Sequence, residues 1–351
     1  MAERPGRGEG RGARDERAAT DASPLVPRPS PLYSRFPLLA AIPRARLGEF
    51  PTPVERLPFP EPLWVKRDDL SAAELGGNKV RALEFLLGGL LPGSEVLTLG
   101  GEGSTHILCT AVHAARLGIR TRAVRWRHDM NPAAVAVRDR ARPLCAELRT
   151  SGGALRGMAA AQLARIGAHG RSLRYIPIGG TSPLGTLGHV NAGLELAEQV
   201  AAGLLPEPAR VVLPLGSGGT AAGLALAFRI AGLRSIVVGV RVAPRIGSNR
   251  ARVLRASRAA AALIARHTGA RPPLPTARDV VVVHGWYGGA YGRALPEAAE
   301  AAATLRRLTG LRLDDTYSAK AFAAALALAR RDSAPTLFWL TFDGRWMKDN
   351  E

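Results

Sequence analysis

The feature that most constrains the fold is an apolar strand that runs through a glycine-rich loop directly into a helix. The segment "RVVLPL" at 210–215 is followed by "GSGGT" at 216–220 and then by the helical run "AAGLALAFRIAGL". Further strand-like segments alternate with Ala-rich helical runs and are "LWVKRDD", "EVLTLGG", "IRTRAVRW", "RYIPIGG", "SIVVGVRV", "DVVVVHG" and "PTLFWLTF". This alternation predicts an α/β fold in which helices cover open parallel sheets.

The glycine-rich loop has the composition of an anion-binding loop. Backbone N–H groups at a helix N-terminus bind phosphate, and glycine allows the anion to approach closely. No Gly-Lys-Ser/Thr follows, so it is not a Walker loop, and the next strand ends in Arg241 where a dinucleotide fold needs an acid. A single phosphate is therefore favoured, and a tight turn without a ligand is the alternative. The N–H groups that would bind the anion belong to Gly216, Ser217, Gly218, Gly219 and Thr220.

Lysine is rare in this basic chain: of its 48 Lys and Arg residues, the lysines are Lys66, Lys79, Lys320 and Lys348. Lys79 follows "ELGGN" at the start of a predicted helix, with Asn78 as its expected cap. The positive end of the helix dipole disfavours the ammonium form, and an uncharged amine is a nucleophile whereas arginine is not. The alternative is an ordinary surface lysine. Lys320 is a weaker candidate for the reactive amine, and Lys66 is interpreted as a charge at a strand end.

A reactive lysine and a monophosphate loop together meet the needs of one cofactor. Pyridoxal 5'-phosphate offers an aldehyde to an amine and a phosphate as an anchor. The sequence therefore predicts pyridoxal 5'-phosphate, bound through Lys79 and the loop at 216–220.

Four segments resemble one enzyme family, in the order that the family has them. The segments "GGNKVRALEF", "GGTSPLGTLGHVNAGLEL", "LGSGGTAAGLALAF" and "GGAYGRALPEA" are similar to parts of the D-cysteine desulfhydrase and 1-aminocyclopropane-1-carboxylate deaminase family. The resemblance runs from about Phe36 to Thr341 and implies the tryptophan synthase β-like fold (fold type II), with Lys79 as the cofactor lysine. It implies cofactor-binding roles for Asn78, Thr105 and Ser318 beside the phosphate loop. It implies substrate-binding roles for Ser104, His106, Tyr291 and Tyr317. Of these, Ser104 and Tyr291 are also expected to be catalytic.

The departures from the family pattern bear on the reaction. Thr105 replaces an asparagine, Arg81–Ala82 replaces Arg-Lys, and "LTFDGR" replaces His-Thr-Gly-Gly. Ser318 stands where the deaminases have a glutamate, and a neutral hydroxyl there favours loss of a β leaving group over opening of a cyclopropane. We therefore expect α,β-elimination on a small amino acid, giving a keto acid and ammonia. The alternatives are β-replacement, racemisation, or a degenerate relative that binds the cofactor without turnover.

Composition limits the partners and the compartment. The net charge of +19 suggests nucleic acid, but the arginines are scattered and aromatic residues make up 5%, so we expect no nucleic-acid partner. Cys109 and Cys145 cannot form a disulfide framework, and no apolar run has membrane-spanning length, so we expect a cytoplasmic protein. His106, Cys109 and His113 share a predicted helix face, but they lack a metal-site spacing, and we expect no metal.

The chain is predicted to contain two domains and a tail. Residues 1–30 are expected to form a disordered tail of mixed charge. Residues 31–90 and 205–351 are expected to form the larger, cofactor-binding domain, and 91–204 a smaller inserted α/β domain. The site would lie in the cleft between them. The family resemblance implies a homodimer.

Overall fold

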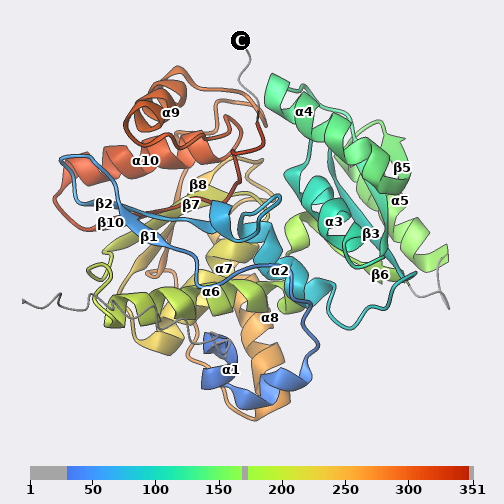
Figure 1. The fold of residues 1–351 in the computed structure, drawn as a ribbon, viewed down its shortest axis with the longest axis horizontal. Coiled ribbons are helices and arrows are strands. Elements are labelled where there is room, and N and C mark those ends of the chain that lie inside the picture. The colour runs from blue at the N-terminus through green and yellow to red at the C-terminus, as the bar shows by residue number, and fades with distance from the viewer. Residues whose placement is uncertain (1–29, 168–172, 348–351) are drawn as a thin grey trace, which may run out of the picture.

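The computed structural model describes residues 30–167 and 173–347, so all but the last residue of the predicted tail at 1–30 lies outside the described residues. Within these ranges the chain forms two sheets, each flanked by helices (Figure 1). Every strand pair in the two sheets is parallel except that between β1 and β2. The predicted α/β class is confirmed. None of the described helices is long and apolar enough to cross a membrane.

The larger sheet has the strand order β1-β2-β10-β7-β8-β9 and is buried on both faces. Successive residues of a strand point to opposite faces, so Val212 packs with α10 while Val211 and Leu213 pack with α7. Helices α9 and α10 cover one face, and α6, α7 and α8 cover the other (Figure 1). The strands are β1 Val54–Arg56, β2 Leu63–Lys66, β7 Arg210–Leu215, β8 Ile236–Arg241, β9 Val280–Val283 and β10 Thr336–Trp339. These helices are α6 Pro183–Ala201, α7 Gly219–Ala231, α8 Arg250–Thr268, α9 Pro296–Thr309 and α10 Ser318–Arg331.

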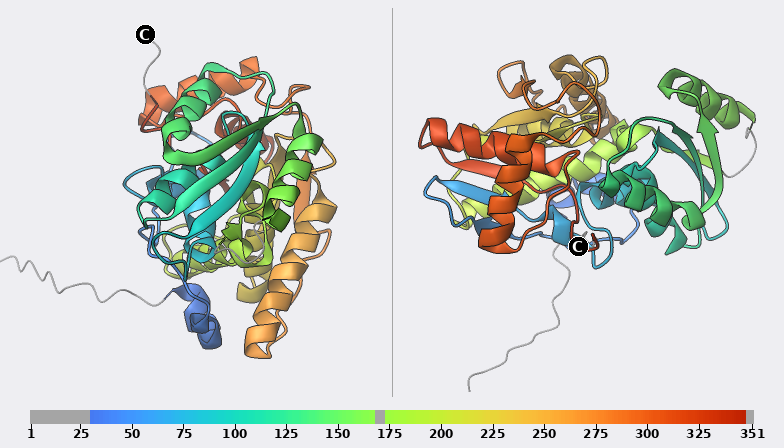
Figure 2. Two further views of the ribbon diagram at one scale, coloured as in Figure 1. Left: turned by 90° about the vertical axis from the view of Figure 1, so that its right-hand side faces the viewer. Right: turned by 90° about the horizontal axis from the view of Figure 1, so that it is seen from above.

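The smaller sheet has the order β5-β4-β3-β6 and stands beside the larger one (Figure 2). Helices α3 and α4 lie on one side and α5 on the other. The segment "CAELRTS" is not among the strand-like segments of the sequence, but it forms the edge strand β5. Its charged residues and half-exposed pattern hide the apolar signal of a strand. The strands are β3 Glu95–Gly101, β4 Arg120–Trp126, β5 Cys145–Ser151 and β6 Leu173–Tyr175, and the helices are α3 Thr105–Ala115, α4 Pro132–Ala141 and α5 Ala154–Gly167. The remaining short helices are α1 Pro31–Arg35, η1 Pro37–Ala41, η2 Asp68–Leu70, η3 Arg142–Leu144 and η4 Ile178–Gly180.

Helix α2, Asn78–Leu86, lies between the two sheets. It packs against α3 of the smaller unit and α6 of the larger one, and every residue in it except Lys79 is buried. Asn78 is not the cap that we predicted: Gly77 takes that place with φ 113. A Cβ on Gly77 would lie 2.5 Å from Thr341 O, so only glycine fits there.

Helix α6 bears on the predicted domain boundaries. It falls within the predicted inserted domain at 91–204, yet it packs against α2, α7 and α8. The boundaries remain a prediction, and this packing favours an inserted domain that ends before Pro183.

A buried ion network joins α2 to the larger unit. Arg81 donates to Asp68 at 2.7 Å and to Glu195 on α6 at 2.9 Å. Lys66 Nζ lies 2.5 Å from Glu195 and also donates to Gln199 Oε1 at 2.7 Å. Lys66 is the last residue of β2, where a charge at the strand end was predicted, and its side chain is 0% exposed. Burial alone would raise the pKa of Glu195, but Arg81 and Lys66 outweigh it and hold that pKa at about 2.

We predict that Glu195→Gln lowers the free energy of unfolding by about 3 kcal/mol, because buried Lys66 loses the carboxylate that it contacts and buried Arg81 keeps only Asp68. Urea unfolding at pH 7 measures the loss. The control Glu55→Gln removes a surface pair with Arg67 and should cost about 1 kcal/mol or less.

The same variant should show a pH-dependent difference from the wild type. A depressed carboxyl pKa stabilises the fold above the ordinary pKa of 4.5 and loses that contribution as the pH falls through about 2. The gap between wild type and Glu195→Gln should therefore narrow below pH 4.5. A gap that is constant down to pH 2 would contradict the assignment.

Candidate active site

Lys79 is the second residue of α2, and its side chain is the one in that helix that is partly open to the surroundings. Its Nζ donates to Asn78 Oδ1 at 3.1 Å. Asn78 Nδ2 donates in turn to Thr220 Oγ1 at 2.7 Å. The asparagine thus links the lysine to the glycine-rich loop, which is why its side chain does not cap the helix.

The groups around the Lys79 amine are mostly uncharged. Burial, and then the nearby Lys79 charge, lowers the pKa of both His106 and His189 to about 3. Burial raises the pKa of the Cys109 thiol to about 12. Burial also lowers the pKa of Lys79 itself, although Asp314 acts in the opposite direction. A desolvated amine with neutral neighbours is favoured in its nucleophilic form.

The predicted phosphate loop lies between β7 and the N-terminus of α7. Gly218 has φ 92 and is the residue before the helix. Thr181, in the turn before α6, donates from its hydroxyl to Ser217 Oγ at 2.7 Å. A Cβ on Gly219 would lie 2.7 Å from Thr181 Oγ1, so this glycine keeps the two turns in contact. The first N–H groups of α7 have no partner within the helix and are available to an anion.

The two predicted tyrosines form a pair beside this loop. The hydroxyls of Tyr291 and Tyr317 hydrogen-bond to each other, and their rings lie 6.0 Å apart at 76°. A Cβ on Gly216 would be 3.9 Å from Tyr317 Cε1, so the pair borders the loop. Burial raises the pKa of Tyr291 to about 12, so its hydroxyl is protonated at neutral pH.

The smaller unit reaches the tyrosine pair through the segment after β4. The His128 ring packs edge-on against Tyr291 with centroids 5.0 Å apart. Asn131 Nδ2 donates to Gly292 O at 3.0 Å and to Thr316 Oγ1 at 3.1 Å. Both units therefore contribute contacts around Tyr291.

Ser318 begins α10, and its side chain is 0% exposed. Its N–H donates to Asp314 Oδ1 at 3.0 Å, whereas its Oγ, which lies close to the same carboxylate, makes no hydrogen bond of good geometry with the described residues. A buried hydroxyl without a partner carries a free-energy cost that a ligand acceptor would remove. Lys320, the weaker candidate amine, is buried in the same helix and donates to Tyr287 O at 3.2 Å.

These features fit pyridoxal 5'-phosphate. Lys79 offers an amine of lowered pKa to the aldehyde, the 216–220 loop offers backbone N–H groups to the phosphate, and Ser318 offers a hydroxyl to the ring nitrogen. The individual roles of the predicted site residues remain predictions.

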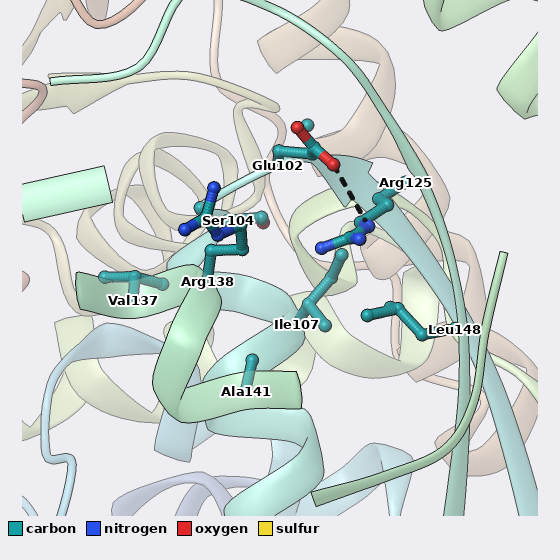
Figure 3. A pocket seen from close by; sticks show the side chains of 10 residues that line it. Glu102, Ser104, Ile107, Arg125, Val137, Arg138, Ala141 and Leu148 are labelled. Carbon is teal, nitrogen blue, oxygen red and sulfur yellow. Dashed lines mark ion pairs between the residues drawn. The ribbon is translucent and has the colours of Figure 1, made fainter. Parts of the chain in front are cut away.

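Ser104 has a different setting from His106. It is the residue before α3 and borders a pocket that α3 forms with α4, where Arg125 pairs with Glu102 at 3.2 Å (Figure 3). His106 Nε2 and Thr98 Oγ1 form a hydrogen bond of 2.8 Å. Cys109 lies about one turn further along α3. Ile107 lines the pocket, about 100° around the helix from His106. Thr105 is partly exposed at the start of α3, and contact of Ser104 or Thr105 with a ligand remains a prediction.

Sequence reasoning assigned no role to three residues near the site. Thr181 contacts the predicted phosphate loop, and His189 lies near Lys79. Asp314 accepts hydrogen bonds from the N–H groups of Tyr317 and Ser318, where α10 begins. Thr181 and His189 belong to the segment "GGTSPLGTLGHVNAGLEL", so the resemblance contained their signal. Asp314 could have been found as an acidic residue just before a helix. Among the described residues, no group could hold a metal ion.

Comparison with characterised sequences gives relatives over most of the chain. The chain is 36% identical over 324 residues to "Nocardicin C-9' epimerase" of Nocardia uniformis subsp. tsuyamanensis, covering 86% of this chain and 93% of that protein. It is 31% identical over 323 residues to "D-cysteine desulfhydrase" of Salmonella choleraesuis (strain SC-B67), covering 86% of this chain and 94% of that protein.

Solved structures and the family comparison agree with these relatives. The crystal structure of an ACC deaminase homologue superposes with a TM-score of 0.73 at 28% identity, covering 88% of this chain and 94% of that one. The predicted fold and the resemblance to desulfhydrases and deaminases are confirmed. The family described as "Pyridoxal-phosphate dependent enzyme" matches residues 45–341. This chain therefore belongs to the family of pyridoxal-phosphate dependent enzymes.

Proposed function

We propose that this enzyme is a lyase that eliminates a β substituent from a small amino acid and releases a keto acid and ammonia. The observation that carries the proposal is the Lys79 amine, desolvated between uncharged histidines and linked through Asn78 to the phosphate loop. The similarity to D-cysteine desulfhydrase supports the reaction class.

Lys79 has two tasks in this proposal. Its Nζ would hold the cofactor through the aldehyde, and the same Nζ would accept the Cα proton of the substrate. Bound pyridoxal phosphate supplies the electron withdrawal that makes this proton acidic. Ser318 Oγ would hold the ring nitrogen by a hydrogen bond without giving the ring a full charge, a setting suited to substrates with a good leaving group.

The remaining residues orient the substrate and assist the leaving group. The substrate carboxylate binds at Ser104 and the N-terminal turn of α3, while His106 lies on another face of that helix, near Lys79. Tyr291 keeps its proton at neutral pH and can donate it to the departing group. Tyr317 holds the Tyr291 hydroxyl in place through their hydrogen bond.

We further propose a cytoplasmic homodimer. The buried Cys109 and the half-buried Cys145 are both free thiols, which supports a reducing compartment. The family resemblance supports the dimer, and light scattering of the purified enzyme measures its mass.

Epimerisation at Cα is the second candidate, because the epimerase of Nocardia uniformis is 36% identical to this chain. It needs the same proton abstraction but returns a proton to the other face of Cα. Enantiomers of β-chloroalanine and alanine in deuterated water separate the two reactions. Pyruvate release from β-chloroalanine supports the lyase, whereas inverted, deuterated amino acid without pyruvate supports the epimerase.

We predict that Lys79→Ala abolishes the visible absorption band that the wild type shows with pyridoxal phosphate, because the band requires the lysine-bound cofactor. Lys320→Met is the matched control and should keep the band. If the band survives in Lys79→Ala or is lost only in Lys320→Met, Lys79 is not the cofactor lysine.

We predict that Tyr291→Phe lowers kcat for elimination about 100-fold, because it removes the proton donor to the leaving group. The dissociation constant of the cofactor should stay unchanged. Tyr33→Phe is the control, because the Tyr33 hydroxyl bonds Ile42 O beside α1 instead. An unchanged kcat in Tyr291→Phe would rule out this role.

A further inference from the structure

The turn that presents Lys79 has an unusual backbone. Leu75 has φ 48 and Gly77 has φ 113, and left-handed backbone in a residue other than glycine costs free energy. A Cβ on Gly76 would lie only 2.2 Å from Asp69 O, so the turn is closely packed. Such a turn keeps its shape only where its surroundings hold it.

Asp343, near the end of the described chain, contacts this turn. Its side chain is 2% exposed, and Oδ2 accepts a hydrogen bond from the Gly76 N–H at 3.1 Å. The neighbouring backbone adds a second bond, in which Asn78 N–H donates to Thr341 O at 3.1 Å. Through these two bonds, the segment after β10 holds the backbone at Gly76 and at Asn78, the residue immediately before Lys79.

Arg345 fixes the carboxylate of Asp343. Its Nε donates to Oδ1 and its Nη2 to Oδ2, each at 2.8 Å. Nη2 also donates to Ala72 O at 2.8 Å and to Asp69 O at 3.0 Å, at the beginning of the same turn. Bidentate pairing is directional, so the carboxylate is held towards Gly76. These two residues belong to "LTFDGR", the stretch in which this chain departs from the family pattern.

We propose that Asp343 is a positioning residue for the Lys79 amine and that Arg345 acts by orienting Asp343. The inference rests on the proposed function in taking Lys79 as the cofactor lysine. Asp343 touches no reacting atom and acts through the backbone from Gly76 to Asn78. Because covalent attachment requires the amine at one place relative to the anchored phosphate, a small displacement of the turn weakens it.

Asp343→Asn tests the proposal, since it keeps the size and an oxygen acceptor but removes the charge that orders Arg345. We expect the dissociation constant of pyridoxal phosphate, from titration of the visible band, to rise about tenfold. We also expect the pH midpoint of that band to move. A merely structural role would lower the melting temperature and leave both quantities unchanged.

Arg345→Met provides a second variant that should fold, because the Arg345 side chain is 45% exposed. Arg345→Met should move the dissociation constant and the pH midpoint of the band in the same direction as Asp343→Asn, but to a smaller extent. The double variant should match Asp343→Asn alone, because the two residues act as one unit. Asp332→Asn, which breaks the surface pair with Arg210, is the control and should match the wild type.

The outcomes separate this inference from the proposed function. Wild-type dissociation constants and band midpoints in both the Asp343 and Arg345 variants would overturn it, even if their melting temperatures fall. If the wild type shows no band with pyridoxal phosphate, the proposed function fails and takes the inference with it.

Discussion

The buried contact of Arg81 with Asp68 and Glu195 is the constraint on which the site depends. Charges are expensive to bury, so their partners must all be present and correctly placed. This network ties α2 to the strand end after β2, to α6 and, through the 2.7 Å bond from Trp339 Nε1 to Asp68, to β10. Lys79 is two residues from Arg81. A helix anchored so firmly on one side can present a reactive group on the other side without moving.

Lys66 and Lys79 show how the surroundings of a lysine decide what the side chain does. Lys66 is in contact with Glu195, Gln199 and Thr52 O, so its charge is compensated and its role is to hold the fold. Lys79 has one amide oxygen at 3.1 Å and neutral histidines nearby. Burial lowers the pKa of both amines, but for Lys66 a carboxylate in direct contact opposes part of this effect. The rarity of lysine in this sequence drew attention to both residues but could not distinguish their roles. The difference depends on which residues each lysine contacts in the folded chain.

The fold class could be predicted because it depends on local pattern, and the same kind of pattern supplied the candidate site residues. Apolar strands, glycines before a helix and a lysine after "GGN" are visible in the chain. The edge strand β5 could not be predicted, because its polar sequence is made regular only by pairing with β4. Asn78 was predicted as a cap because its type prefers that position, whereas Thr220, 142 residues away, determines what it does. Thr181 and Asp343 likewise gain their contacts only when distant segments meet.

The division of contacts between the two units suggests where reaction type is determined. Lys79 lies on α2, the predicted phosphate loop lies between β7 and α7, and Ser318 begins α10. All of these elements pack against the larger sheet or are joined to it by the ion network. The tyrosine pair instead contacts His128, and the loops that carry it bond Asn131, so the smaller unit helps to place it. On the proposed function, the larger unit therefore holds the cofactor. The fate of the substrate after loss of its Cα proton would then depend on Tyr291, because both units contribute the contacts that place it.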